Sequence, residues 1–247
     1  MTDPLPVTPA SCRGLRWLPR LDDGFASRTA LVPLQPQELG RAAAAMPLAF
    51  VRRGAHWEVV GVCGLAAESS LFVDEGHWLG AYRPTWLDLW PFAAVETGKG
   101  MVVTMAPEAR AAGAAAGEVL FDAAGQPSPA LAAMLERLQQ WHRQQATLRS
   151  LTPTLAKARL LMPWPDALRA SLGLQIEGLH CVDERALNAL DDRAFAALRQ
   201  TLPIAFAVNL SMGQVHLLER LRRWHEAKTP NTPDVAGDLE FDFSQTH

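Results

Sequence analysis

The sequence has few cysteines, a single tyrosine and no excess of basic charge. Its three cysteines, Cys12, Cys63 and Cys181, lie far apart and form no CxxC pair. A sparse, odd set of cysteines argues against a disulfide framework and fits a reducing compartment. The formal net charge of −3 at pH 7 differs from the basic surface that nucleic-acid binders present. We therefore expect no nucleic-acid partner.

Long apolar runs are also missing. Residues 1–20 contain no basic start followed by an apolar core of roughly 7–15 residues, as a secretory signal would. The longest apolar stretch, Leu202–Leu210, is interrupted by Pro203 and is much shorter than the roughly 18 residues of a membrane span. We expect a cytoplasmic protein without a membrane span, unless a signal-less route exports it to the surface.

The common catalytic and nucleotide-binding motifs are absent from the sequence. It contains no GxSxG, GxGxxG, GxxxxGK[ST] or HExxH. The seven histidines are scattered, and none is paired at metal-ligand spacing. Cys63 lies inside an apolar, β-type run, which favours a core thiol over a nucleophile. The sequence therefore predicts no catalytic residue, no metal and no cofactor.

Large aromatic side chains, prolines and titratable groups concentrate instead in residues 71–92. This stretch holds three of the tryptophans and the single tyrosine, Tyr82. Trp78, Tyr82 and Trp86, closed by Arg83, would form a pocket for a ligand with a flat apolar part and an acid. The other interpretation, which we favour, is that they are core anchors whose polar tips bond to the backbone.

A short polar cluster, Asp74, Glu75 and His77, opens the same stretch. Neighbouring residues on a strand point to opposite faces, so Glu75 and His77 would share a face and Asp74 would not. Two ligands are too few for a metal site, and the composition is typical of a hairpin turn. Glu75 and His77 remain candidates for binding a ligand beside the aromatic residues.

Two hairpins are predicted in the N-terminal half of the chain. The first joins the β-type runs 48–53 and 56–65 around Gly54. The second joins residues 91–96 to 100–105 through a Gly-Lys-Gly turn. The sequence thus predicts an antiparallel sheet mainly in this half.

The clearest helix is predicted to start at Ser128, a good N-cap, with Pro129 at the first helical position. Apolar residues at a period close to 3.6 carry it to about Ser150, with a second helical piece at 155–162. Further helices follow, so the fold class is α+β with helices mainly in the C-terminal half. We expect an extended arm at 1–28, one domain at 29–227 and a flexible acidic tail at 228–247.

Short segments recur along the chain in an order and spacing that resemble a known family. Before residue 100 these are Leu31–Leu34, Pro47–Val51, Gly61–Leu65, Leu71–Asp74, Trp78–Pro84 and Pro91–Phe92. Later ones are Leu120–Asp122, Gly125–Ser128, Leu138–His142, Val182–Glu184 with Leu187, and Leu210–Gly213 with His216–Leu218. Together they resemble the SapC family of bacterial proteins over residues 29–223.

The resemblance implies an accessory protein that is linked to the bacterial surface layer or envelope. Such a protein would act by binding a protein partner rather than by catalysis, and the resemblance transfers no catalytic residue to this chain. The sequence departs from the family at His77, where Arg or Lys is common, and at Trp90, where a tyrosine is common.

Two further functions remain open. An oxidative or metal-dependent enzyme for a small aromatic or peptide substrate would use the polar and aromatic candidates above, together with His142 or His180. Convergence of two histidines and a carboxylate in space would favour it. A non-catalytic sensor or carrier would bind a small aromatic ligand in the same pocket without turnover.

Overall fold

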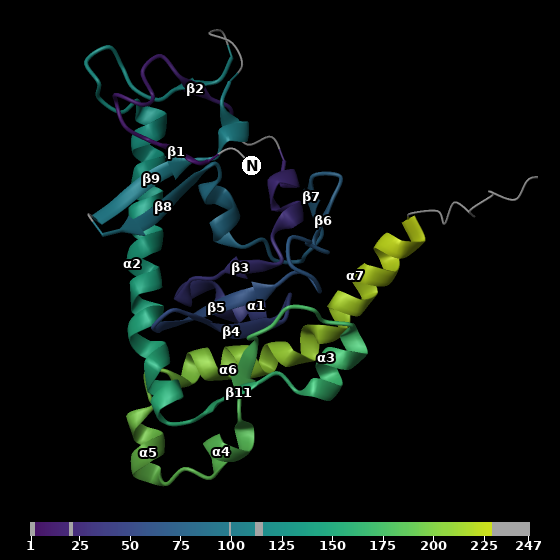
Figure 1. The fold of residues 1–247 in the computed structure, drawn as a ribbon. Coiled ribbons are helices and arrows are strands. Elements are labelled where there is room, and N and C mark those ends of the chain that lie inside the picture. Colours follow the sequence, from purple (N-terminus) through teal and green to yellow (C-terminus); the bar gives the residue numbers. More distant parts are fainter. Residues whose placement is uncertain (1–2, 20–21, 99, 112–115, 229–247) are drawn as a thin grey trace, which may run out of the picture.

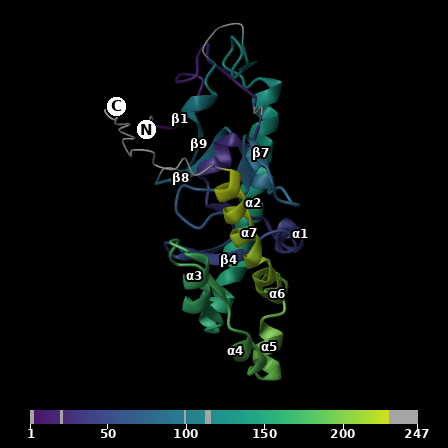
Figure 2. The same ribbon diagram turned by 90° about the vertical axis from the view of Figure 1, so that its right-hand side faces the viewer.

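Two antiparallel sheets lie at different heights along one long helix, α2 (Pro129–Lys157), in this computed structural model (Figure 1). The structure describes residues 3–19, 22–98, 100–111 and 116–228. At 29 residues, α2 is about 43 Å long. It therefore runs past both sheets, and the molecule is elongated along it (Figures 1 and 2).

The larger sheet has five antiparallel strands. Their spatial order is β11 (Leu161–Pro163), β12 (His180–Val182), β4 (Leu48–Arg53), β5 (His56–Val62) and β3 (Leu31–Pro33). The predicted hairpin at its centre is confirmed, since β4 and β5 pair from Leu48 opposite Gly61 to Arg53 opposite His56. Gly54 has φ +58°, a left-handed conformation that glycine adopts without steric cost.

The smaller sheet has three strands in the order β1 (Leu5–Pro6), β9 (Gly100–Met105) and β8 (Phe92–Thr97). The second predicted hairpin, β8–β9, is thereby confirmed. Within the described residues no further strand pairs with β8, so β8 is an edge strand. Two short pairs complete the strands: β2 (Arg16–Trp17) with β10 (Glu118–Val119), and β6 (Val73–Asp74) with β7 (His77–Trp78).

The remaining helices are short, and most follow α2 in sequence. The α-helices are α1 (Leu39–Ala43), α3 (Asp166–Leu172), α4 (Glu184–Asn188), α5 (Asp192–Ala197), α6 (Leu202–Ser211) and α7 (Val215–Lys228). The 3₁₀ helices are η1 (Gly24–Arg28), η2 (Pro36–Glu38), η3 (Thr85–Leu89), η4 (Pro107–Ala109) and η5 (Met212–Gln214). Both views place α4 and α5 at the end of the molecule farthest from the smaller sheet. The described helices and sheets confirm the predicted α+β class, and none of these helices has the length and apolarity that a membrane span requires.

The predicted end of the long helix near Ser150 is wrong. Ser128 caps the helix by accepting a hydrogen bond from the Leu131 N–H, as predicted, but α2 continues through Pro153 to Lys157. A proline inside a helix costs about 3 kcal/mol. Fully buried Leu148 and Leu155 on either side of Pro153 offset that cost by packing into the core.

Two hydrophobic cores form along α2. The small-sheet core contains Phe92, Met105 and Leu120, and α2 contributes Leu131 and Leu138 to it. The large-sheet core contains the centres of β4 and β5, and α2 contributes Leu148 and Leu155. The middle of α2, from Trp141 to Gln145, therefore crosses the junction between the two cores.

The described residues of the predicted arm, 3–19 and 22–28, pack on the body of the protein. Cys12 and Trp17 belong to the small-sheet core, whereas Ala26 belongs to a separate small cluster with Val73 and Leu87. Trp17 packs edge-on against Phe92 with ring centroids 5.0 Å apart, and Cys12 and Ala26 are fully buried. The domain boundaries proposed from the sequence stay a prediction. All of the predicted acidic tail except Lys228 lies outside the described residues.

Candidate functional site

A buried carboxylate, Glu38, fixes the middle of the aromatic stretch. Its Oε2 accepts hydrogen bonds from the Tyr82 hydroxyl at 2.8 Å, from the Thr85 hydroxyl at 2.7 Å and from the Thr85 N–H at 3.0 Å. Its Oε1 accepts one from the Gln35 N–H at 2.6 Å. Burial, followed by the bond to Glu38, raises the pKa of Tyr82 above its ordinary value. Tyr82 is thus held in place by a carboxylate from η2 that the sequence reasoning did not single out.

Trp78 and Arg83 make similar structural contacts. The Trp78 indole donates to the Tyr82 carbonyl at 2.8 Å and packs on Phe72. Arg83 donates to both carboxylate oxygens of Asp23 and, at 2.5 Å, to Asp88. Two carboxylates thus already bind this guanidinium. The contact with Asp23 ties the 71–92 stretch to the start of η1, and the contact with Asp88 fixes η3 within the stretch.

Glu75 and His77 lie at the β6–β7 turn, as their turn chemistry predicted. Glu75 has φ +46°, and with Asp74 it accepts hydrogen bonds from Lys228 at 2.8 and 2.5 Å. His77 is exposed on the returning strand. The turn therefore holds the C-terminal end of α7.

A cleft of about 330 Å³ lies between the two cores, where α2 passes from one to the other. Five aromatic side chains from three parts of the chain line it: Phe25, Trp86, Trp90, Phe92 and Trp141. We call it the aromatic cleft. Trp86 is the one member of the six candidate ligand-binding residues that lines it, and the loop fixed by Glu38 and Arg83 carries Trp86 and Trp90 to its wall.

Polar groups from β5 and α2 occupy one end of the aromatic cleft. Glu58 and Arg149 form an ion pair at 2.9 Å, and His142 lies beside them in the lining. Burial, followed by the nearby positive charge of Arg149, lowers the pKa of His142 below its ordinary value. His142 is therefore a neutral imidazole at pH 7, able to donate and accept a hydrogen bond.

Two buried donors in the lining have no acceptor among the described residues. They are the Trp141 Nε1 and the Arg149 Nε. An unsatisfied buried donor costs about 1–3 kcal/mol. These two atoms are buried beneath the surface of the cleft, whose accessible lining is mainly aromatic.

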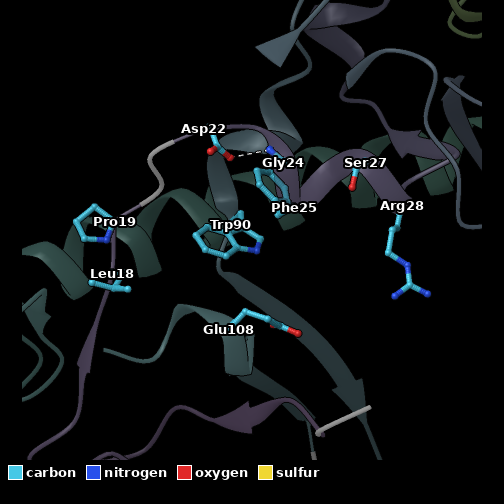
Figure 3. A pocket seen from close by; sticks show the side chains of 9 residues that line it. All are labelled: Leu18, Pro19, Asp22, Gly24, Phe25, Ser27, Arg28, Trp90 and Glu108. Carbon is cyan, nitrogen blue, oxygen red and sulfur yellow. Dashed lines mark hydrogen bonds between the residues drawn. The ribbon is translucent and has the colours of Figure 1, made fainter. Parts of the chain in front are cut away.

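Three further cavities lined by described residues adjoin the aromatic cleft, and one of them, of about 260 Å³, shares Leu89 and Trp141 with it. The outer cavity, of about 500 Å³, shares Phe25 and Trp90 with it. These two rings stack with centroids 5.1 Å apart, and Figure 3 shows them at the centre of this cavity, with Leu18 to one side and Arg28 to the other. The sheet cavity, of about 370 Å³, shares Ala94, Leu138 and His142 with the cleft. The outer cavity therefore adjoins the cleft on the side of η1, and the sheet cavity adjoins it along β8 and α2.

The histidines considered for an enzyme have different surroundings. His142 lines the aromatic cleft, whereas His180 packs edge-on against Trp57 with centroids 4.8 Å apart. In the described part of the chain no group of three His, Cys, Asp or Glu side chains is arranged to hold a metal ion.

Most of this cleft was not predicted from the sequence. Trp86 and, for the enzyme alternative, His142 were among the candidates, whereas Phe25, Trp141 and the Glu58–Arg149 pair were not. One signal was available, because buried Gln145 interrupts the apolar stripe of α2 between Leu138 and Leu148. Its side chain donates to the Leu34 carbonyl at 2.6 Å, at a buried residue of the large-sheet core.

The fold and the site define an α+β protein whose candidate site is an aromatic cleft between two cores on one helix. A family model described as SapC matches residues 9–218, and the chain belongs to the SapC family. This confirms the resemblance seen in the sequence and extends it at the N-terminal side, where the match includes Trp17 and Phe25. Searches of curated proteins and of solved structures found no match.

Proposed function

We propose that this SapC family protein acts by binding a protein partner through the aromatic cleft. The observation that carries the proposal is the convergence of aromatic side chains from η1, η3 and α2 on one open site. Tryptophan-rich, well-packed pockets are where protein interfaces concentrate their binding energy. The family resemblance supports a partner from the bacterial surface layer or envelope.

The proposal keeps Trp86 from the candidate ligand-binding residues and gives the others a positioning role. Trp78, Tyr82 and Arg83 hold the loop that presents Trp86, through the hydrogen bonds to the backbone, to Glu38 and to Asp23. Glu75 holds the end of α7 through Lys228, and His77 lies beside it on the turn.

A second candidate function is a carrier or sensor of a small aromatic ligand. The cleft volume of about 330 Å³ falls at the lower end of the range of small-molecule sites, about 300–1,000 Å³.

Native mass spectrometry tests both functions on protein purified gently from cells that produce it naturally. We expect a complex heavier than the denatured chain by the mass of a whole protein, and its loss in Trp90→Ala. Trp224→Ala is the matched control, because Trp224 is exposed on α7 and lines none of these cavities. An excess of a few hundred daltons that Trp90→Ala removes would establish the carrier instead. A native mass of the wild type equal to that of the chain alone, or a complex that Trp90→Ala leaves intact, would refute binding through this cleft.

A further inference from the structure

The sheet cavity lies between the β8–β9 hairpin and the N-terminal half of α2 (Figure 1). Ala94, Met101 and Val103 line it from the hairpin. Ala94 pairs with Val103, and Met101 lies two positions from Val103, so the three side chains share one face of the hairpin. Met101 is 50 % exposed, and the cavity therefore opens to solvent beside an aliphatic wall.

One face of α2 supplies the opposite wall. Its lining residues are spaced as neighbours on a single helical face: Leu135, Leu138, Gln139, His142 and Arg143. A rise of about 1.5 Å per residue places Leu135 about 12 Å from Arg143 along the helix axis. The wall is therefore apolar at its Leu135 end and polar at its Arg143 end.

His142 separates the sheet cavity from the aromatic cleft. Its ring hydrogen-bonds the backbone of Ala94, and both residues line both sites. The lowered pKa of His142 leaves the ring neutral at pH 7. Glu96 acts on His142 electrostatically but does not line the cavity. Among the described residues that do line it, Arg143 is thus the one charged side chain.

Arg143 is available to a ligand. It is exposed, and within the described part of the chain neither Arg143 nor Gln139 uses its side chain in a hydrogen bond or an ion pair. Arg149, further along α2, differs because it pairs with Glu58. A guanidinium presents paired N–H donors that fit both oxygens of a carboxylate. The donors at the polar end of the cavity are therefore suited to an acid.

We propose that the sheet cavity binds a medium-chain aliphatic carboxylate. The carboxylate accepts hydrogen bonds from Arg143, with Gln139 one helical turn away as a second donor. The chain extends over Met101 and Val103 toward Leu135. The ligand thus places its charge and its apolar part at the matching ends of the cavity.

The size and lining of the cavity favour this class of ligand. Its volume of about 370 Å³ is near the lower end of the range of small-molecule sites, about 300–1,000 Å³. The apolar lining residues are aliphatic, which suits a short alkyl chain. The inference goes beyond the proposed function, because the tryptophans of the aromatic cleft, Trp86, Trp90 and Trp141, do not line the sheet cavity.

Isothermal titration calorimetry with octanoate and 1-octanol tests the proposal. The two probes have chains of the same length, and the alcohol has no charge. We expect saturable binding of octanoate. Arg143→Gln should weaken it at least about tenfold and change the affinity for octanol by less than about twofold. Arg137→Gln is the matched control and should leave both affinities unchanged, because Arg137 is exposed on α2 and does not line this cavity.

Methyl NMR of the methionines locates the bound probe. The signal of Met101, assigned through Met101→Leu, should shift as octanoate is added, whereas that of Met46, fully buried in the large-sheet core, should not. Val103→Phe enlarges a lining side chain and should weaken both probes alike.

Three results would overturn the proposal: no saturable binding of octanoate, an equal loss of both probes in Arg143→Gln, or binding that leaves the Met101 signal in place. The native mass test of the proposed function depends on Trp90, which does not line the sheet cavity. Failure of one test is therefore distinguishable from failure of the other.

Discussion

Replacing the Glu38 carboxylate with an amide should both destabilise the protein and lower the pKa of Tyr82. Glu38 accepts four hydrogen bonds while it is 2 % exposed. Glu38→Gln leaves one acceptor oxygen, so either Gln35 or the Tyr82–Thr85 side loses its acceptor. An unsatisfied buried donor costs about 1–3 kcal/mol, and we expect a loss of about 2 kcal/mol. Tyr82→Phe removes a single bond to a charged acceptor and should cost about 1–2 kcal/mol.

The pH dependence of this effect has a definite sign. The pKa of Tyr82 is raised in the folded state, so its contribution to stability is complete below the unfolded pKa near 10. That contribution is lost as the pH rises through the folded pKa. Glu38→Gln removes the negative charge beside the phenol. The pKa of Tyr82 should therefore fall toward 10, and the alkaline loss of stability should become shallower.

Tyrosinate absorbance and urea unfolding measure the two consequences. Tyr82 is the single tyrosine, so the titration reports on this residue alone. Glu226→Gln is the control, because it removes an exposed carboxylate that pairs with Arg222, and it should change stability by less than about 0.5 kcal/mol. An unchanged tyrosinate midpoint, with both buried variants as stable as wild type, would show that the Glu38 network stabilises nothing.

Three further predictions concern single positions. The pKa of His142 is lowered in the fold, so its NMR titration should have a midpoint below about 6.5, and its contribution to stability should be lost as the pH falls through that region. Arg149→Gln should move the midpoint of His142 upward, and an unchanged midpoint would show that the charge of Arg149 does not lower this pKa. Complete burial raises the pKa of Cys63, so a thiol reagent should modify it only after unfolding; rapid labelling of the native protein would contradict this. Gly64→Ala should cost at least about 3 kcal/mol in urea unfolding, because a Cβ there would lie 1.8 Å from the Ser69 carbonyl oxygen; wild-type stability would show that the loop shifts freely.

Local signals in the sequence identified the hairpins and the start of the long helix correctly. Gly54 between two β-type runs and Ser128-Pro129 before an apolar period each act over a few residues. The end of α2 was not predictable in this way. Whether a helix continues through Pro153 depends on how much Leu148 and Leu155 gain from packing against distant β5, and no local pattern reports that gain.

The candidate site was only partly predictable for the same reason. The aromatic stretch was recognisable from composition, yet four of its candidate residues are occupied by contacts that hold the loop or the end of α7. Asp23 binds Arg83 from a position 60 residues earlier in the chain, and Glu38 binds Tyr82 from a position 44 residues earlier. From the sequence alone, such a distant carboxylate could equally be a hydrogen-bond partner of the aromatic stretch or a solvent-exposed residue.

The position of the cleft follows from the length of α2. One helix serves two cores, and a helix stripe that is apolar throughout would have fused them. Gln145 and His142 interrupt that stripe where the cores meet. An apolar side chain at position 145 would leave the buried Leu34 carbonyl without the hydrogen bond from Gln145. The gap between the cores is therefore maintained by polar side chains on α2. The aromatic rings of η1 and η3 line the gap and do not fill it, and for this reason we propose the junction as the site that receives another chain.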